Sequence, residues 1–315
     1  MSRVSGFSLA EVLVAMLVMV VVMATLLAVL SRATDAITMQ PEASDAQQRL
    51  RVSIATLQRD LLNAGAGGYI GPVAGALSHF IAPVQPYRWG VDPAGAFRDD
   101  VVTAIYVPAA PAQATVSDVR ANPGEDVEVD LRSGDGAHTF EPGMRVMIVE
   151  PAGAWAFGVV TSVTPSVLRL RAATGVAPAL DAGQSTVVEV STHTYSLKPD
   201  AATGAFQLVH YDGVETEMPV VDHVVSMRFR YWLEQPGVAG LVEAAGASLT
   251  DGPWLPDAAS PLRYDADLLG VRRLSVQLRV QATSPWLRVS GDRSHRIPDG
   301  ELVLEVAPPN LNFRW

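Results

Sequence analysis

Hydrophobic and polar residues are distributed unevenly along this chain, and the longest apolar run lies near its first residue. From Val12 to Leu30 nineteen residues carry no charge, and Thr25 is the only clearly polar one. A helix of that length spans roughly 28 Å at about 1.5 Å per residue, close to the hydrocarbon thickness of a bilayer. The pattern therefore predicts a transmembrane segment of a helix over residues 7–30.

The helix is expected to continue outside the membrane as an amphipathic segment over residues 31–64. Its apolar residues recur at spacings of four, three and four, which places them on one helix face. These residues are Leu50, Ile54, Leu57 and Leu61. Glycines follow from Gly65 onward and predict the end of the helix.

Pro41 lies inside this predicted helix. Because proline lacks a backbone N–H and its ring crowds the preceding turn, we expect a kink or an interruption near Thr38 and Met39. Ser44 or Asp45 would then cap a restarted segment. The sequence thus predicts a long, bent N-terminal helix.

The rest of the chain has the pattern of β-strands. Residues 65–99 form a Gly/Pro-rich connector without the Gly-Lys-Ser/Thr ending of a phosphate loop. Beyond it, short alternating or apolar runs are separated by Gly, Pro and Ser. They predict strands at residues 101–107, 127–131, 144–149, 156–163, 167–170, 186–197, 206–211, 220–232, 271–280 and 302–306.

The expected fold class is therefore α+β, with the helix packed on a mainly antiparallel, β-rich head over residues 100–315. Strands are most closely spaced between residues 124 and 172. That spacing indicates a small inserted β subdomain, either a barrel or a meander.

Composition narrows the range of partners. The 315 residues include 33 acidic and 23 basic ones, a formal net charge of −10, without a cluster of Lys and Arg. An acidic chain of this kind is not expected to bind nucleic acid. The absence of cysteine excludes disulfides and thiolate metal sites, so an exported head must be stabilised by its core.

No constellation typical of an enzyme is found in the sequence. The histidines lack metal-ligand spacing, and those at 193 and 223 fall in strand-like runs, where a structural role is expected. The six are His79, His138, His193, His210, His223 and His295. Paired acids at 99–100 and 125–126 are weak calcium candidates and are usually only solvated. We therefore predict a protein without catalytic residues, metal or cofactor.

Aromatic residues near the predicted loops are candidates for contacts with partner subunits, although core packing explains most of them equally well. They are Tyr87, Trp89, Trp155, Trp254, Trp286 and Trp315.

The N-terminal motif carries more information than any other part of the chain. A six-residue leader with one positive side chain, Arg3, ends at Gly6 and is followed by Phe7 and by the single acid Glu11. A secretory signal peptide has a shorter apolar core of about 7–15 residues, and a plain anchor gives no role to an acid at this position. A buried core helix is rarely apolar on every face. The motif resembles the class III signal of type IV prepilins and pseudopilins.

The resemblance assigns roles to individual residues. It implies that a prepilin peptidase cleaves between Gly6 and Phe7, that the new amino group of Phe7 is methylated, and that residues 1–6 are a leader peptide. It also implies that Glu11 meets the positive N-terminus of a neighbouring subunit in the filament. An unpaired carboxylate in an apolar environment costs several kcal/mol, so such a partner would stabilise it and set the axial register.

Later segments are similar to PilW-type minor pilins. The segments that carry this resemblance are 59–65 (RDLLNAG), 100–106 (DVVTAIY), 221–231 (VDHVVSMRFRY), 274–280 and the closing Asn-Leu-Asn-Phe. They imply a non-enzymatic subunit that joins other minor pilins and the major pilin, in a complex that primes pilus assembly or caps its tip. The implied location is the bacterial inner membrane, crossed once with the head in the periplasm, and then the filament or cell surface. Many pilins have a C-terminal disulfide, which this chain cannot form.

Three alternatives remain open. A J-type minor pseudopilin of type II secretion shares the helix and the β-rich head, but is typically shorter. A membrane-anchored binding or adhesin module would keep residues 1–6. An anchored periplasmic enzyme would need a clustered site that the sequence does not display.

Overall fold

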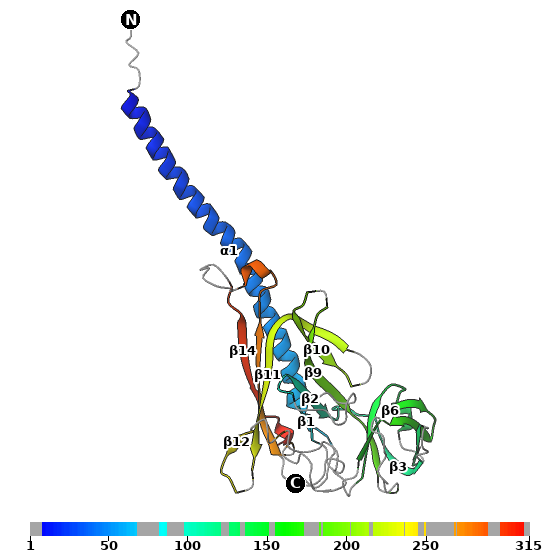
Figure 1. Ribbon diagram of the computed structural model, residues 1–315. Coiled ribbons are helices and arrows are strands. Elements are labelled where there is room, and N and C mark those ends of the chain that lie inside the picture. Colours follow the sequence, from blue (N-terminus) through cyan, green and yellow to red (C-terminus); the bar gives the residue numbers. More distant parts are fainter. Residues whose placement is uncertain are drawn as a thin grey trace. The chain divides into compact units, whose positions relative to one another are not determined.

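The computed structural model has one long N-terminal helix, α1 (Leu9–Asn63), and a mainly antiparallel β-rich body, which is an α+β arrangement (Figure 1). It describes residues 8–67, 82–86, 98–120, 126–132, 136–150, 155–172, 183, 185–201, 203–213, 217–235, 237–244, 249, 268, 270–288 and 297–311. The chain divides into two compact units. The first unit is Met1–Gln48 with Gln281–Gly300, and the second is Arg49–Val280 with Glu301–Trp315.

Helix α1 runs through Pro41 without interruption. The expected restart capped by Ser44 or Asp45 is therefore wrong, because both residues lie inside the continuous helix. A proline removes one intrahelical hydrogen bond, and contacts on either side of it can hold the helix together. The bend stays a prediction.

Those contacts come from residues 282–287 and from Ile297, which belong to the same unit. Met39 and Ala43 pack against a small buried cluster made of Ala282, Leu287 and Ile297. The carboxylate of Glu42, which lies between Met39 and Ala43 in the sequence, accepts hydrogen bonds from the Thr283 backbone N–H at 3.0 Å and the Ser284 hydroxyl at 2.7 Å. Ser284 directly precedes a short 3₁₀ helix, η5 (Pro285–Leu287). The helical turns around Pro41 are thus stabilised by tertiary contacts.

The second unit contains an antiparallel sheet of eight strands in the order β1-β2-β9-β10-β11-β13-β14, with β12 paired to β11. The strands are β1 (Val84–Gln85), β2 (Val101–Tyr106), β9 (Ser191–Pro199), β10 (Phe206–Tyr211), β11 (Glu217–Glu234), β12 (Leu241–Glu243), β13 (Val271–Val280) and β14 (Gly300–Val306). The predicted strands at 206–211 and 271–280 are confirmed at both ends. The short strands β1 and β12 were not predicted.

A closed barrel is formed by six further strands in the order β3-β4-β7-β6-β5-β8. They are β3 (Gln113–Arg120), β4 (Val127–Leu131), β5 (Arg145–Val149), β6 (Trp155–Val163), β7 (Val167–Ala172) and β8 (Thr186–Glu189). All six lie in sequence between β2 and β9, which pair directly with each other in the sheet. Strands β3 and β8 extend the barrel beyond residues 124–172.

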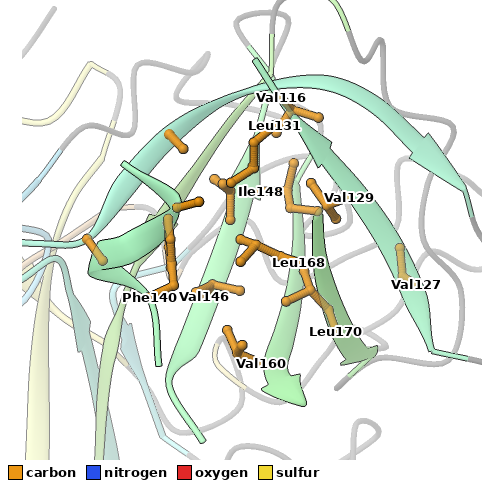
Figure 2. Packing of buried hydrophobic residues seen from close by; sticks show 14 residues of the cluster. Val116, Val127, Val129, Leu131, Phe140, Val146, Ile148, Val160, Leu168 and Leu170 are labelled. Carbon is orange, nitrogen blue, oxygen red and sulfur yellow. The ribbon is translucent and has the colours of Figure 1, made fainter. Parts of the chain in front are cut away.

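Apolar side chains fill the interior of the barrel. Val116, Val129, Ile148 and Leu168 are among the fully or almost fully buried members of this cluster, and they point toward one another from different strands (Figure 2). The alternation of β4, with Val127, Val129 and Leu131 inward, follows from the two-residue period of a strand. This barrel has its own packed core.

The prediction of one strand over residues 186–197 is wrong. The segment forms two strands, β8 in the barrel and β9 in the sheet, with Val190 between them. The Val190 N–H donates to the Arg145 carbonyl of β5 at 2.9 Å. The chain thus passes from the barrel to the sheet at one apolar residue, Val190, and no Gly or Pro signals the break.

The C-terminal part of α1 packs on the sheet of the second unit, as its apolar spacing predicted (Figure 1). Four apolar side chains on this face are buried: Leu50, Ile54, Leu57 and Leu61. Arg49 reaches Asp222 of β11, with its Nη1 3.5 Å from the carboxylate Oδ1. Just beyond the helix, Gly65 adopts a φ of 76° and its N–H donates to the Ile105 carbonyl at 2.9 Å. Glycine suits this left-handed ending because it has no Cβ.

Candidate functional site

The first part of α1 exposes its apolar side chains instead of burying them. Between Leu9 and Leu30 the large apolar side chains are 49–85 % exposed. The helix is long and apolar enough to cross a membrane. The hydroxyl of Thr25 donates to the Val22 carbonyl at 2.8 Å, so the polar group of this run is satisfied inside the helix. Such internal satisfaction is what a helix in lipid requires.

Glu11 is placed at the first turn of this apolar helix, where it forms a capping box with Ser8. Its Oε2 accepts from the Ser8 backbone N–H at 2.8 Å and lies 3.0 Å from the Ser8 hydroxyl, while the Glu11 N–H points to Ser8 Oγ at 3.3 Å. The motif Ser-x-x-Glu before an apolar run signals such a cap, and it is readable in the sequence. Gly6 and Phe7, the residues of the expected cleavage site, lie outside the described residues.

A second site lies where α1 ends. Asp60 is fully buried, yet it is a carboxylate. The Tyr195 hydroxyl donates to its Oδ2 at 2.5 Å, and Oδ1 accepts from Arg59 Nε at 3.0 Å and from the Tyr106 hydroxyl at 3.3 Å. Three donors therefore surround a charge that burial alone would penalise.

Two histidines complete this cluster, which we call the Asp60 cluster: Asp60, Tyr106, His193, Tyr195 and His210. His193 Nδ1 lies 2.7 Å from His210 Nε2 and 3.5 Å from Asp60 Oδ2, and His193 Nε2 lies 3.1 Å from the Tyr106 hydroxyl. The two imidazole rings are within 20° of parallel, with centroids 5.0 Å apart.

Strand register explains how the cluster forms. Tyr195 of β9 is paired with His210 of β10, and His193 lies two residues before Tyr195, on the same face of its strand. His193 is paired with Ala104 of β2, and Tyr106 follows Ala104 by two residues. One sheet face therefore presents all four rings to the end of α1.

The requirement that each polar group has a hydrogen-bond partner determines which atom donates and which accepts in the Asp60 cluster. The Tyr106 hydroxyl has a single proton, which it donates to Asp60. Its oxygen must then accept the Nε2–H of His193, which leaves His193 Nδ1 as the acceptor of the Nε2–H of His210. This assignment gives each of these groups a partner and is inferred from the network.

The electrostatic environment keeps the imidazoles neutral and the carboxylate ionised. Burial lowers the pKa of His193 and His210 below the usual value, and the nearby Asp60 only partly offsets this. Burial would raise the pKa of Asp60, but the hydrogen bond from Tyr195, the electrostatic interaction with His193, and the hydrogen bond and charge of Arg59 hold it below the usual range. Burial and the Asp60 charge raise the pKa of Tyr106 to about 12.

The histidines that are scattered in sequence are therefore not all scattered in the fold. One ligand atom each from Asp60, His193 and His210 lie within 4.8 Å of one another, an arrangement that could hold a metal ion. Sequence reasoning missed this group because its members come from α1, β9 and β10. The one readable signal was that His193 and Tyr195 share a strand face.

The remaining candidates are placed elsewhere. His138 is exposed in a 3₁₀ turn, and His223 is buried in β11 beside Asp222, with Nδ1 and Oδ2 3.3 Å apart. Asp100 is paired with Arg98 at 2.6 Å, and the Asp126 carboxylate accepts from Thr161, so these two acids have protein partners. His79, His295 and Glu125 lie outside the described residues.

Among the aromatic residues considered as partner contacts, Trp286 is 63 % exposed. The side chain of Trp155 is outside the described part of the chain. Tyr87, Trp89, Trp254 and Trp315 also lie outside the described residues.

Comparison with protein-family models, with curated proteins and with solved structures gave no match. The function of the chain must therefore be inferred from its own motifs and geometry.

Proposed function

We propose that this protein is a minor pilin, a non-enzymatic subunit that takes part in type IV pilus assembly. It is made as a prepilin in the bacterial inner membrane, with its head in the periplasm, and is cleaved between Gly6 and Phe7. The new N-terminus of Phe7 is methylated. The chain then enters the filament, together with other minor pilins and the major pilin, as part of a priming complex or the tip.

The observation that carries the proposal is the contrast along α1. Its first part exposes a continuous apolar surface headed by the single acid Glu11, while its last part buries an apolar face against a β-rich body. A segment that only anchors a protein needs the apolar surface alone. A filament subunit needs both, because the exposed half packs among other helices and the buried half holds the head.

Glu11 is the residue where the proposal can be tested most directly. In the present chain its carboxylate is held by Ser8 of the same molecule. In the filament we assign it the positive N-terminus of a neighbouring subunit, an interaction that is stronger in an apolar environment than in water. The capping box positions the carboxylate at the start of the helix before that partner arrives.

The first experiment measures the intact mass of the protein purified from cells with and without prepilin peptidase. We expect a chain that begins at a methylated Phe7 only when the peptidase is present. A leader retained in peptidase-positive cells would favour the anchored binding or adhesin module and would refute the pilin proposal.

The second experiment compares Glu11→Ala with Ser8→Ala in cells that carry the filament machinery. Glu11→Ala is expected to be inserted and cleaved normally but to be depleted from sheared filaments. Ser8→Ala removes the side-chain cap and keeps the carboxylate, so it is expected to assemble. Equal depletion of both variants would show that Glu11 acts only as a helix cap, and normal assembly of Glu11→Ala would remove its role altogether.

The J-type pseudopilin differs from this proposal in the filament that it joins. Rescue of pilus assembly in a strain that lacks the gene supports the minor-pilin proposal. Rescue of protein secretion alone would move the protein to the type II system.

A further inference from the structure

We propose that Asp60, His193 and His210 form a binding site for one divalent transition-metal ion of the zinc class. The site joins the end of α1 to β9 and β10, and it is independent of the proposed role in pilus assembly. It provides two imidazole nitrogens and one carboxylate oxygen, the donor set that zinc takes in three-ligand sites with an open fourth position.

Two of the three donor separations are within about 0.6 Å of those around such an ion, and the third, between His210 and Asp60, is within 4.8 Å. Tetrahedral zinc with ligands at about 2.0–2.2 Å separates its nitrogen and oxygen ligands by about 3.4 Å. His193 Nδ1 and Asp60 Oδ2 are 3.5 Å apart. The two imidazole nitrogens are 2.7 Å apart, a hydrogen-bond distance. They must separate by about 0.6 Å to reach the 3.3 Å of two zinc-bound nitrogens.

The surrounding hydrogen bonds prepare two of the three ligands. The bond between His193 Nε2 and the Tyr106 hydroxyl favours the tautomer whose Nδ1 lone pair faces Asp60. The Tyr195 hydroxyl orients the Asp60 carboxylate from β9. For His210 the ion replaces the hydrogen bond to His193, and the ring proton moves to Nδ1 without changing the charge of the ring.

Charge and access also favour an ion at this position. Asp60 supplies a buried negative charge, and the histidines are half-buried, with the His193 side chain 20 % exposed. An ion can therefore approach from the histidine side. Its competitor is the Arg59 guanidinium, which binds Asp60 Oδ1 and is 68 % exposed, so it can swing into solvent.

The test uses the full chain in detergent, purified without a histidine tag and treated with chelator, then titrated with Co²⁺ alone. We expect one Co²⁺ per chain, with the intense visible absorption of a tetrahedral ion, displaced by one equivalent of Zn²⁺. His210→Asn keeps a hydrogen-bonding side chain but loses the ligand nitrogen, and we expect at least about tenfold weaker binding.

Two control variants test whether the ion binds at the Asp60 cluster and not elsewhere on the chain. His138→Asn replaces an exposed histidine and should leave the affinity unchanged. Arg59→Gln removes the competing cation and should tighten the binding of Co²⁺. Unchanged or weaker binding in this variant would show that Arg59 only makes a structural contact with Asp60 and does not compete with the ion.

Absence of tetrahedral Co²⁺ absorption from the wild-type chain would overturn the proposal, whether or not the variants fold. The same absorption and affinity in His210→Asn as in the wild type would also overturn it.

Discussion

The replacement of Tyr195 by Phe tests whether the buried carboxylate of Asp60 depends on its hydroxyl donors. Tyr195 is fully buried, and its hydroxyl donates to Asp60 Oδ2 at 2.5 Å. Hydrogen bonds to charged groups contribute about 1.5–3 kcal/mol, and the Phe variant would leave Asp60 Oδ2 without its shortest hydrogen bond. We expect Tyr195→Phe to lower the free energy of unfolding by about 2 kcal/mol.

Tyr231 offers a matched control in the same sheet. It is equally buried, but its hydroxyl has no hydrogen-bond partner among the described residues. Burial and the negative charge of Asp99 strongly raise the pKa of this hydroxyl, so it stays neutral in the folded protein. Removing an unpaired buried hydroxyl relieves a desolvation penalty, so Tyr231→Phe should be neutral or stabilising by up to about 1 kcal/mol.

The assay is urea unfolding of the full chain in detergent, followed by tryptophan fluorescence with chelator present, so that bound metal does not contribute. The two variants must have the wild-type slope of free energy against urea, which keeps the comparison on stability alone. If Tyr195→Phe unfolds at the same urea concentration as Tyr231→Phe, the hydroxyl does not stabilise Asp60 and the reasoning is refuted.

Two further predictions concern backbone conformation and use the same unfolding measurement. Gly67→Ala should destabilise by about 1–3 kcal/mol more than Gly204→Ala. Both glycines have a positive φ, but an added Cβ at Gly67 would lie 2.2 Å from Val107 Cβ, whereas at Gly204 it would meet nothing within 4 Å. Equal losses of unfolding free energy in the two variants would show that the Val107 side chain moves aside without cost. His223 has a φ of 53° and lies where the pairing of β11 shifts register. Because a left-handed backbone penalises a Cβ atom, His223→Gly should be more stable than His223→Ala by about 1 kcal/mol. The opposite order of stability would show that the backbone strain at His223 is absent.

The Asp60 cluster shows why a site can be invisible in a sequence. Its ligand candidates are separated by 133 and 17 positions, counted from Asp60 to His193 and from His193 to His210. Metal-ligand spacing is a local signal that arises when one turn or one helix carries several ligands. Here the ligands are brought together by strand pairing and by the packing of a helix end.

Sequence reasoning succeeded where one local period dominated. The apolar run of α1 determined an exposed helix long enough to cross a membrane, and the spacing of Leu50, Ile54, Leu57 and Leu61 determined which face of its continuation is buried. Alternation located β4, β10 and β13 at both ends. These features follow from the 3.6-residue and two-residue periods, which need no knowledge of distant residues.

The tertiary structure decided the features that depend on distant partners. Five of the eight residues of β3 are polar or charged and its apolar residues do not alternate regularly, so its pairing with β4 and β8 defines it. Residues 186–199 are divided between the barrel and the sheet because β8 pairs with β3 and β9 pairs with β2. α1 continues through Pro41, where Glu42 and its neighbours bind residues 282–287 and Ile297. A buried carboxylate persists at Asp60 because two hydroxyl donors and one guanidinium donor converge on it from β2, β9 and α1. Local sequence sets the period of each element, whereas partners far along the chain decide which elements meet and which polar groups are satisfied.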